Sequence, residues 1–198
     1  MVSVGPRHFV ISSQTSGATR HRFGRSPAES REEGFMRILS SRCRTFAYTI
    51  TTPSRVAMEL GPAVIGTVNR FDGCLFLMVG VERDDIRLGS RPVKTIRRIA
   101  AKTDAQCVVI NGFSHLAHPG IRPDVDTARG VLDRLVEGLQ ARSLRVHLMP
   151  FGWNKQWTAD VLDGEWEQRM DHLTPSVPHS HAVRATTLPS PPRDRTPI

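Results

Sequence analysis

Two side chains able to take part in acid–base or electrostatic catalysis each follow an apolar run that is predicted to be a strand. His115 comes shortly after Cys107–Ile110, and Lys155 comes shortly after Leu144–Met149. A lysine ammonium can hold a carbonyl oxygen, a phosphate or a water. An imidazole, with an unperturbed pKa near ~6.5, can hold a substrate group or move a proton. A solvated loop lysine and a histidine bonded to its own loop backbone are the structural alternatives.

A helix predicted between these two strands would bring the loops together. Apolar residues recur at spacings of three and four from about Asp124 to Ala141. They are Val125, Ala128, Leu132, Leu135 and Leu139. A strand, a crossover helix and a second strand in one sheet imply parallel pairing, so the loops after both strands lie at one sheet edge, where open α/β sheets bind ligands. His115 and Lys155, the latter in a predicted loop over 151–157, are therefore expected to be neighbours.

Further segments complete a predicted small α/β domain, with a central mixed or parallel sheet and flanking helices. Met36–Leu39 and Leu75–Val81 are apolar enough for buried strands. A half-buried strand over 46–50 is predicted to follow the first through a hairpin around Arg42–Arg44. Residues 91–102 are predicted to form an amphipathic helix with Ser90 at its N-cap. Trp166 and Met170 are expected to pack back on the core.

Composition limits the classes of function. The 198-residue chain carries a formal net charge of +8, which favours a polyanion such as nucleic acid, although the base composition of the gene explains it equally well. The length fits one domain of ~100–150 residues, which is enough to bury one core. Three cysteines in or near predicted strands, Cys43, Cys74 and Cys107, indicate buried thiols in a reducing compartment. No apolar run approaches the ~20 residues that span a bilayer.

The two ends of the chain differ from the middle. Residues 1–35 show little apolar periodicity, and Arg7, Arg20, Arg22 and Arg25 precede the first acid, Glu29. A transit peptide fits this segment, but a disordered leader, or a translation start assigned upstream of a working start at Met36, is favoured. Prolines and serines dominate from residue 174 to 198, which predicts a disordered tail. The folded domain is expected to span 36–173.

The loops and the helix between them resemble a known family. Gly112–Leu116, the helix over 125–139 and Pro150–Lys155 are similar to the amino-terminal editing domain of archaeal-type threonyl-tRNA synthetases. The family's usual forms are Phe-Ala-His-Leu and Pro-Phe-Gly-Trp/Tyr-Tyr-Lys. The likeness extends to Met36–Leu39, which matches the family's first strand, and to Leu75–Glu82. It covers about residues 36 to 170.

The resemblance implies a fold similar to D-aminoacyl-tRNA deacylases and hydrolysis of serine wrongly esterified to threonine tRNA. A hydroxyl of the terminal adenosine assists in the family, and no ATP, metal or other cofactor is needed. Two catalytic residues are implied, because the motif histidine falls on His115 and the catalytic lysine on Lys155. The strand-end pair that lines the adenosine pocket falls on Val81 and Glu82.

The resemblance also implies substrate-binding positions and partners. Phe113 and Ser114 precede the motif histidine, and Trp153 and Asn154 precede the motif lysine. The implied partner is the 3′ end of an aminoacylated tRNA, met by a free-standing domain in the cytoplasm and away from membranes. A threonyl-tRNA synthetase and a second copy of the chain are further candidate partners.

Three departures from the family pattern matter for activity. Asn154 stands where an aromatic residue is common, and Arg42–Arg44 replaces a polar segment after the first strand. The family's later carboxylate falls nearest Gln168, with Glu167 adjacent, so its register is open.

Two alternative functions remain. One is a degenerate fold that binds tRNA or a protein partner without turnover, and the other is a site for a small nucleotide or amino-acid conjugate. His115 and His118 lack a third ligand in view, so no metal is expected.

Overall fold

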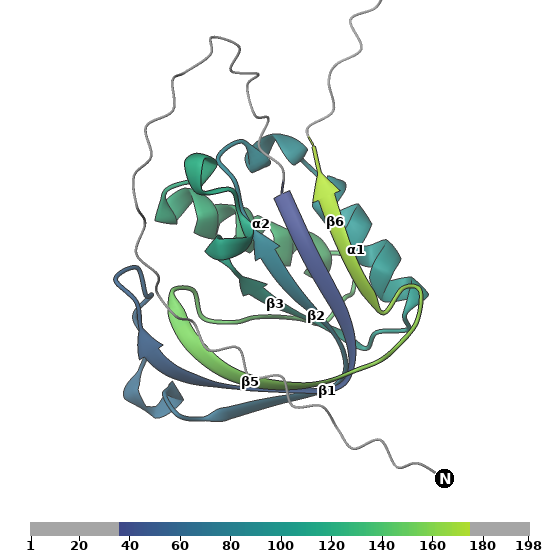
Figure 1. Cartoon of the computed structure of the whole chain (residues 1–198), viewed down its shortest axis with the longest axis horizontal. Helices are drawn as coiled ribbons and strands as arrows, with labels where there is room; N and C mark the ends of the chain where they lie inside the picture. The colour runs from purple at the N-terminus through teal and green to yellow at the C-terminus, as the bar shows by residue number, and fades with distance from the viewer. Residues whose placement is uncertain (1–35, 175–198) are drawn as a thin grey trace, which may run out of the picture. The chain divides into compact units, whose positions relative to one another are not determined.

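A computed structural model describes residues 36–174, in which the strands form one mixed sheet (Figure 1). The strands are β1 (Met36–Pro53), β2 (Val68–Gly80), β3 (Cys107–Gly112), β4 (Val146–Leu148), β5 (Trp153–Val161) and β6 (Gln168–Leu173). The sheet order is β4-β3-β2-β1-β5, and β6 also pairs with β1. The helices are α1 (Arg91–Lys102) and α2 (Val125–Gln140), with short 3-10 turns η1 (Pro62–Val64), η2 (Asp85–Leu88), η3 (Ser114–Leu116) and η4 (Pro119–Ile121). The expected α/β class with a mixed sheet is confirmed.

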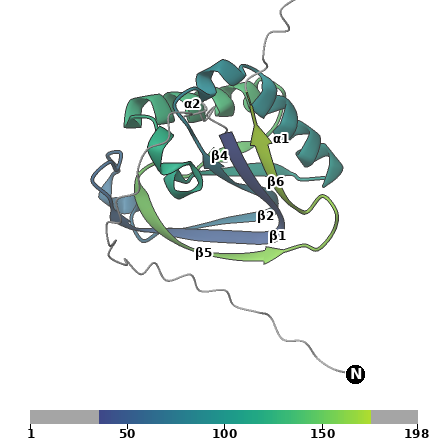
Figure 2. The ribbon, with the colours of Figure 1, turned by 45° about the horizontal axis from the view of Figure 1, so that its top comes forward.

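Both helices cover one face of the sheet (Figure 2). Their apolar stripes pack with inward residues of the central strands, as the helical periodicity requires. This main core includes Leu75, Leu77, Val108, Ile110, Ile96, Ile99, Leu132, Leu135 and Leu139. Asp124 caps α2 as a carboxylate, since its Oδ1 accepts the Thr127 N–H at 2.8 Å. Ser90 occupies the N-cap of α1 without a side-chain hydrogen bond, so that predicted cap is positional only.

The parallel unit predicted from the sequence is confirmed. β3 pairs in parallel with β4, with Val109 opposite His147, and α2 joins the two strands. β2 pairs in parallel with β3 and antiparallel with β1. The carboxyl ends of β3 and β4 therefore lie side by side.

The predicted hairpin around Arg42–Arg44 is wrong, because β1 runs without a turn from Met36 to Pro53. Cys43 is fully buried and pairs with both Cys74 and Val161, so this stretch stays in the sheet. A register shift between Cys43 and Thr45 bends the strand instead of reversing it. β6 pairs with the first part of β1 and β5 with the rest, which gives one long strand two successive neighbours.

A second apolar cluster lies on the helix-free face of the sheet, inside the bend of β1. It contains Cys43, Phe46, Tyr48, Ile50, Cys74, Phe76, Val109 and Met149. Phe46 and Phe76 stack with ring centroids 4.3 Å apart. The three cysteines are free thiols on adjacent strands, with Cys74 paired in register to both Cys43 and Cys107. The expectation of buried thiols is thus confirmed for Cys43 and Cys74, whereas Cys107 is only half-buried.

Trp166 and Met170, both expected to pack back on the core, differ in the structure. Trp166 packs against the helical core, and the Arg169 guanidinium lies 4.4 Å from its ring centroid. Met170 is 45% exposed, so the prediction that it packs on the core is wrong. Residues 1–35 and 175–198 lie outside the described part, where the predicted leader and most of the predicted tail fall. No helix among the described residues is long and apolar enough to cross a membrane.

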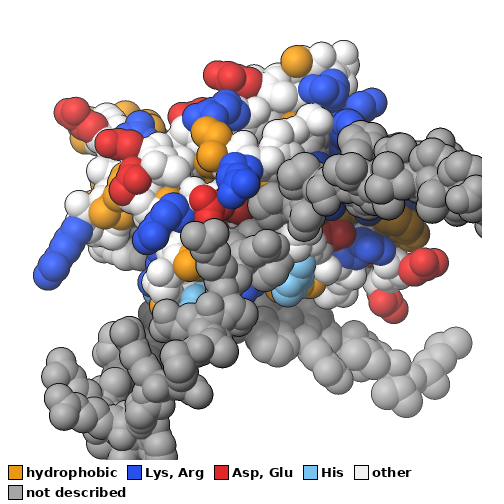
Figure 3. All heavy atoms as spheres, turned by 90° about the horizontal axis from the view of Figure 1, so that it is seen from above, with side chains coloured by type: hydrophobic (Ala, Val, Ile, Leu, Met, Phe, Trp, Pro, Cys, Tyr) orange, Lys and Arg blue, Asp and Glu red, His pale blue; other side chains and the backbone are white. Residues whose placement is uncertain are grey.

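Basic and acidic side chains are interspersed on the end of the molecule seen in Figure 3. This end does not present a continuous field of one sign in that view. Any preference for a polyanion must therefore come from particular basic residues and not from this face as a whole.

Candidate active site on the helix-free face

Lys155 is the most perturbed cation of the described chain. Its Nζ donates to Asn111 Oδ1 at 3.2 Å and to the Trp153 carbonyl at 3.0 Å. Burial lowers the pKa of Lys155 from 10.5 to about 8, because the ammonium gives up water for two neutral acceptors. No carboxylate of the described residues forms an ion pair with it. A lysine in this state is poised between its charged and neutral forms near physiological pH.

The sequence placed Lys155 in a loop, and that prediction is wrong. Lys155 is the third residue of β5 and pairs with Ile50 of β1. The error arose because the turn consists only of Phe151 and Gly152, the latter at φ +76, and the strand starts at once after it. A strand holds a side chain more firmly than a loop does, which suits a positioned ammonium.

Asn111 is the functional residue that the sequence reasoning missed. It lies near the carboxyl end of β3, is 9% exposed and offers its amide oxygen to Lys155. Burying a polar side chain costs free energy unless it forms a hydrogen bond, and for the Asn111 oxygen Lys155 supplies that bond. The signal was present in the sequence, since a polar Asn follows the apolar run Cys107–Ile110 at the sheet edge where ligands bind.

The sheet curls over this site, and two side-chain contacts show it. Lys155 of β5 meets Asn111 of β3, although β1 and β2 separate those strands in the sheet order. Tyr48 Oη of β1 lies 2.7 Å from His147 Nε2 of β4, again across two strands. Burial raises the pKa of Tyr48 to about 12 and lowers that of His147, so both groups are neutral at pH 7. This neutral pair and the lysine pair span the concave, helix-free face.

The loop after β3 carries three of the predicted site residues. Phe113 is 38% exposed, and Ser114 and His115 are exposed in η3. The rings of Phe113 and His115 lie 5.5 Å apart. No hydrogen bond within the described part joins His115 to Lys155; the lysine meets Asn111, earlier in the same chain segment. The structure thus brings the His115 loop and strand β5 to the same end of β3, without a hydrogen bond between the predicted catalytic pair.

Gly80 lets this loop approach the sheet. A Cβ at Gly80 would lie 2.8 Å from backbone atoms of Leu116 and Ala117, closer than side-chain carbons come to backbone. The Leu116 carbonyl accepts from Arg37 Nη1 at 2.9 Å, and the Phe113 N–H donates to the Val79 carbonyl. The Arg37 side chain of β1 and the backbone of β2 therefore fix the segment that bears His115.

Val81 and Glu82 follow directly after β2 and are both buried, at 6% and 0% exposure. Glu82 Oε1 accepts the His118 N–H at 2.8 Å and pairs with Arg37 Nη1 at 3.3 Å. Removing either partner from a buried ion pair leaves an uncompensated charge. In this structure Glu82 holds the 113–118 segment in place, and the sequence had no means of showing its pairing with Arg37.

The motif before the lysine splits between the two faces of β5. Trp153 is half-buried and its Nε1 donates to the Met58 carbonyl at 2.8 Å, which is a structural role. Asn154 is exposed and its amide donates to Thr52 Oγ1 at 2.9 Å. Successive side chains of a strand point to opposite faces, so Asn154 does not share the face of Lys155. Trp157, on the lysine side, is 37% exposed.

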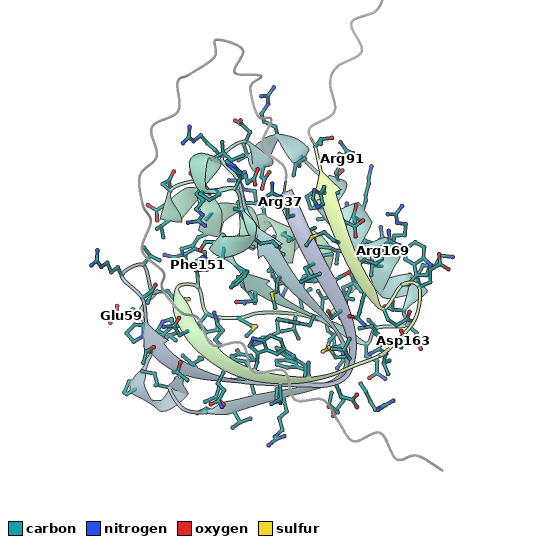
Figure 4. All side chains as sticks on the ribbon, viewed as in Figure 1. Arg37, Glu59, Arg91, Phe151, Asp163 and Arg169 are labelled. Atoms are coloured by element: carbon teal, nitrogen blue, oxygen red, sulfur yellow. The ribbon has the colours of Figure 1, made fainter. Side chains whose placement is uncertain are left out.

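The two candidate carboxylate positions lie far from Lys155. Gln168 pairs with Ser41, and the Glu167 carbonyl accepts the Arg42 N–H, whereas Lys155 pairs with Ile50. From Arg42 to Ile50 the chain covers on the order of 25 Å at ~3.3 Å per residue. Figure 4 shows Asp163, at the start of this segment, on the opposite side of the view from Phe151, which precedes the lysine strand. Glu167 Oε2 accepts the Trp166 N–H instead.

The described residues contain no group of three or more side chains placed to hold a metal ion. His118 Nδ1 accepts the Gly120 N–H at 3.3 Å and so caps its own turn. The histidine pair that invited a metal interpretation therefore has a structural use for one member.

The fold and the site together define a small α/β domain with a desolvated lysine on the open face of its sheet, able to stabilise developing negative charge on a bound oxygen. Residues 36–165 match the family described as the archaea-specific editing domain of threonyl-tRNA synthetase, and the chain belongs to that family.

Two similar proteins accompany this match. A threonine–tRNA ligase of Methanobrevibacter smithii is 32% identical over 124 residues, which make up 61% of this chain and 20% of the ligase. A solved structure titled c-Myc DNA Unwinding Element Binding Protein overlaps with 71% of this chain and 99% of its own, at 12% identity and a TM-score of 0.48. The chain thus spans a small part of the ligase's length.

Proposed function

We propose that this protein hydrolyses mischarged aminoacyl-tRNA, with Ser-tRNA(Thr) as substrate, acting in trans as an editing domain. The observation that carries the proposal is the half-desolvated Lys155, bonded to Asn111 on a domain of the editing family. A group that stabilises charge appearing only in the transition state raises the rate rather than the affinity. Lys155 has that character, since its neighbours are neutral.

The chemistry is the attack of water on the ester carbonyl that joins the amino acid to the terminal ribose. The carbonyl oxygen becomes an oxyanion, which the Lys155 ammonium stabilises and orients. The ester C–O bond then breaks, the ribose oxygen takes a proton that the attacking water released, and the free amino acid leaves. The family resemblance implies that a hydroxyl of the terminal adenosine assists, and we assign the relay of that proton to the ribose hydroxyl beside the ester.

The other site residues hold the substrate. His115, with Phe113 and Ser114, forms the exposed rim after β3 that contacts the amino acid end. The resemblance assigns Val81 and Glu82 to the adenosine side of the site, where they are buried and support the 113–118 segment. Trp153 supports the strand of Lys155, and Asn154 borders it from the other face. His115 is thus a catalytic-site residue of smaller effect than Lys155.

The aminoacylated 3′ end of tRNA is the proposed partner, and the cytoplasm is the proposed location. The chain's net charge of +8 favours binding of a polyanion such as tRNA. A threonyl-tRNA synthetase and a second copy of the chain are secondary partners in this proposal. The reaction uses no cofactor.

The test is deacylation of a panel of mischarged tRNAs by wild-type protein and Lys155→Ala. We expect Ser-tRNA(Thr) to be hydrolysed and Thr-tRNA(Thr) to persist, with discrimination of roughly 10–200-fold if one methyl group is all that is sensed. Lys155→Ala should lose turnover at nearly unchanged tRNA affinity. His115→Ala should reduce the rate less.

The second candidate is a fold that binds tRNA without turnover, favoured by the distance of Glu167 and Gln168 from Lys155. Equal and slow deacylation by wild type and Lys155→Ala, with both still binding tRNA, would establish this candidate and reject the enzyme.

A further inference from the structure

A cavity of about 280 Å³ lies between the two helices and the start of β1, on the helical side of the sheet. Figure 2 shows the first residues of β1 beneath the helical layer, whereas Lys155 belongs to the helix-free face. The walls of the cavity are mostly apolar, with Met36, Val93, Val131 and Leu135 among them, and its charged members are Asp85 and Arg134. The volume is near the lower end of the ~300–1,000 Å³ typical of small-molecule sites. The cavity therefore has room for one small ligand, apart from the proposed active site.

Asp85 brings a buried carboxylate to this cavity with one oxygen unused. The residue is 3% exposed, and its Oδ2 accepts the Glu82 N–H at 2.7 Å. Its Oδ1 is buried without a hydrogen-bond partner in the described part of the chain. A buried oxygen without a partner costs free energy, which a donor on a ligand would recover. Because the Glu82 N–H already orients the carboxylate, Oδ1 is held ready for such a donor.

The fold itself needs no charge at position 85. The bond from the Glu82 N–H closes a turn, since the Asp85 N–H also donates to the Glu82 carbonyl at 3.2 Å. The side-chain oxygen of a neutral Asn accepts the same bond. Burial raises the pKa of Asp85 to about 7, and the charges of Glu82 and Asp84 act in the same direction, so the ionised form is costly here. A buried acid whose charge the fold does not use, at the wall of a cavity, points to a cationic ligand.

A bare metal ion does not fit this place. The structurally described residues contain no group of three or more side chains placed to hold one, and Asp85 is the one acid among the residues that line the cavity. Hard cations take several oxygen ligands, which apolar walls do not offer. The cation that fits is therefore an organic ammonium attached to an apolar body.

Arg134 supplies the opposite charge at the mouth of the cavity. It lies on α2 one turn after Val131 and next to Leu135, so the three share one side of the helix. Arg134 and the wall residue Ile86 are exposed, whereas Asp85 is enclosed. No ion pair within residues 36–174 joins Arg134 to Asp85. The cavity thus has a negative inner end, an apolar middle and a positive mouth.

We propose that this cavity binds a free α-amino acid with an apolar side chain, of about the size of leucine. The ammonium of the ligand donates to Asp85 Oδ1, its carboxylate pairs with the Arg134 guanidinium, and its side chain lies among the apolar walls. Both polar contacts are charge-assisted. A lone amine would leave Arg134 unused, and a lone carboxylate would be repelled by Asp85. Neither contact involves Lys155.

Four probes test the class of ligand. Leucine carries an ammonium, a carboxylate and an apolar side chain; isoamylamine lacks the carboxylate, isocaproate lacks the ammonium, and serine lacks the apolar side chain. Nuclear magnetic resonance titrations of the isotope-labelled full chain measure each Kd. We expect leucine to bind with a Kd of about 1 mM or tighter, and each of the other three at least about tenfold more weakly. No saturable binding of leucine, or equal affinity for any of the other probes, overturns the proposal.

Two matched pairs of variants test the two polar contacts. Asp85→Asn removes the inner charge and keeps an acceptor for the Glu82 N–H, and Asp84→Asn is its control, because Asp84 is exposed and does not line the cavity. Arg134→Gln removes the charge at the mouth, and Arg129→Gln is its control, exposed on the same helix outside the cavity.

We expect Asp85→Asn to weaken leucine binding about tenfold or more, because the contact it removes is buried and charge-assisted. Arg134→Gln should weaken leucine binding about threefold or more, and both controls should stay within about twofold of wild type. Unchanged leucine affinity in Asp85→Asn or in Arg134→Gln overturns the proposal. Because Arg134 is exposed, its variant remains a test even where Asp85→Asn does not fold.

Lys155→Ala separates this cavity from the proposed active site. Leucine should bind Lys155→Ala with the same Kd as wild type, since the lysine lies on the other face of the sheet. Loss of leucine binding in Lys155→Ala would place the ligand on the helix-free face and overturn the cavity site. A chain that binds leucine at the cavity but does not deacylate tRNA would reject the proposed function and leave this site standing.

Discussion

Lys155 illustrates how one side chain connects stability with chemistry. Its ordinary pKa is 10.5 and its folded pKa is about 8, so the unfolded chain binds more protons between these values. Stability must then rise with pH across that window, and below about 8 the full cost of burying the ammonium is present. The protein keeps a charge that weakens its fold, which fits a residue retained for function.

Replacing Lys155 by Met removes that cost while keeping a long side chain. We expect Lys155→Met to be more stable than wild type at pH 7, by about 1 kcal/mol after allowance for the partial exposure of the lysine and its two lost hydrogen bonds. Urea unfolding at pH 7 and at pH 9.5 measures it. The advantage should shrink at the higher pH; a destabilised variant at both values would mean that the hydrogen bonds outweigh desolvation.

Burial lowers the pKa of Lys155, and a charge introduced at its neighbour Asn111 should shift that pKa again. If the ammonium is the active form, the enzyme-dependent rate of deacylation should fall as pH rises through about 8, after subtraction of spontaneous hydrolysis. Asn111→Asp places a carboxylate where a neutral oxygen now lies 3.2 Å from Nζ. An opposite charge at this range raises a lysine pKa by roughly 1 unit or more, so the fall should move to higher pH.

The pH profiles of wild type and Asn111→Asp are the measurement. Asn111→Leu is the control, because it removes the hydrogen bond and adds no charge; it should lower the rate without moving the break upward. A wild-type rate that climbs through pH 8 to a plateau would identify the neutral amine as the active form instead.

At the scale of elements, the turn before β5 fixes where the strand begins and so positions Lys155. Gly152 has φ +76, and a Cβ there would lie 2.5 Å from the Val56 carbonyl oxygen. Both the left-handed conformation and the close backbone oppose a side chain. The turn also joins the strand ends, since the Gly152 carbonyl accepts the Ser54 N–H at 2.9 Å.

Gly152→Ala should therefore destabilise the fold by about 1–3 kcal/mol and reduce deacylation beyond what the lost stability explains. Gly61→Ala is the matched control, because Gly61 has an extended backbone and no heavy atom near its added Cβ. Thermal melting and the deacylation rate of the two variants are compared. Equal and small effects would mean that the turn relaxes and that β5 does not need this geometry.

Some elements were readable from the sequence, and others were not. The helices over 91–102 and 125–140 follow from local periodicity, which single sequences carry well. The continuity of β1 was hidden because the register shift between Cys43 and Thr45 and the polar Arg42 and Arg44 interrupt the apolar alternation. Arg42 is used in the sheet, donating to the Thr103 carbonyl at 2.8 Å, a contact that only tertiary structure reveals.

The site shows the same division. The parallel pairing of β3 and β4 was predicted, but Lys155 lies on β5 and reaches the end of β3 at Asn111 instead of meeting His115. The partner of Lys155 was not predicted, because it depends on the curl that carries β5 over two intervening strands. Sequence spacing contains no information on such curvature. The pairings of Glu82 with Arg37 and of Asp85 with the Glu82 N–H were not predicted either, because they depend on tertiary structure.

At the scale of the whole molecule, the two faces of the sheet have different uses. The helices cover the face that bears Val108 and Ile110, while Asn111 and Lys155 share the side of Val109. A tRNA end that reaches Lys155 must approach the helix-free side. Exposed Arg97, on α1, then lies on the wrong face for contact, whereas exposed Arg55 is next to Ser54, which bonds the turn before the lysine strand.

Charge reversal at these two arginines tests this orientation. Arg55→Glu and Arg97→Glu change the net charge equally, so any difference in tRNA affinity reflects position and not total charge. We expect Arg55→Glu to weaken binding about threefold or more and to reduce the slope of log K against log salt by about 1. Arg97→Glu should leave the Kd within about twofold. Titrations of aminoacylated tRNA over a range of salt concentrations measure the Kd and the salt dependence of both variants. The reverse order of effects would place the tRNA on the helical face, away from Lys155.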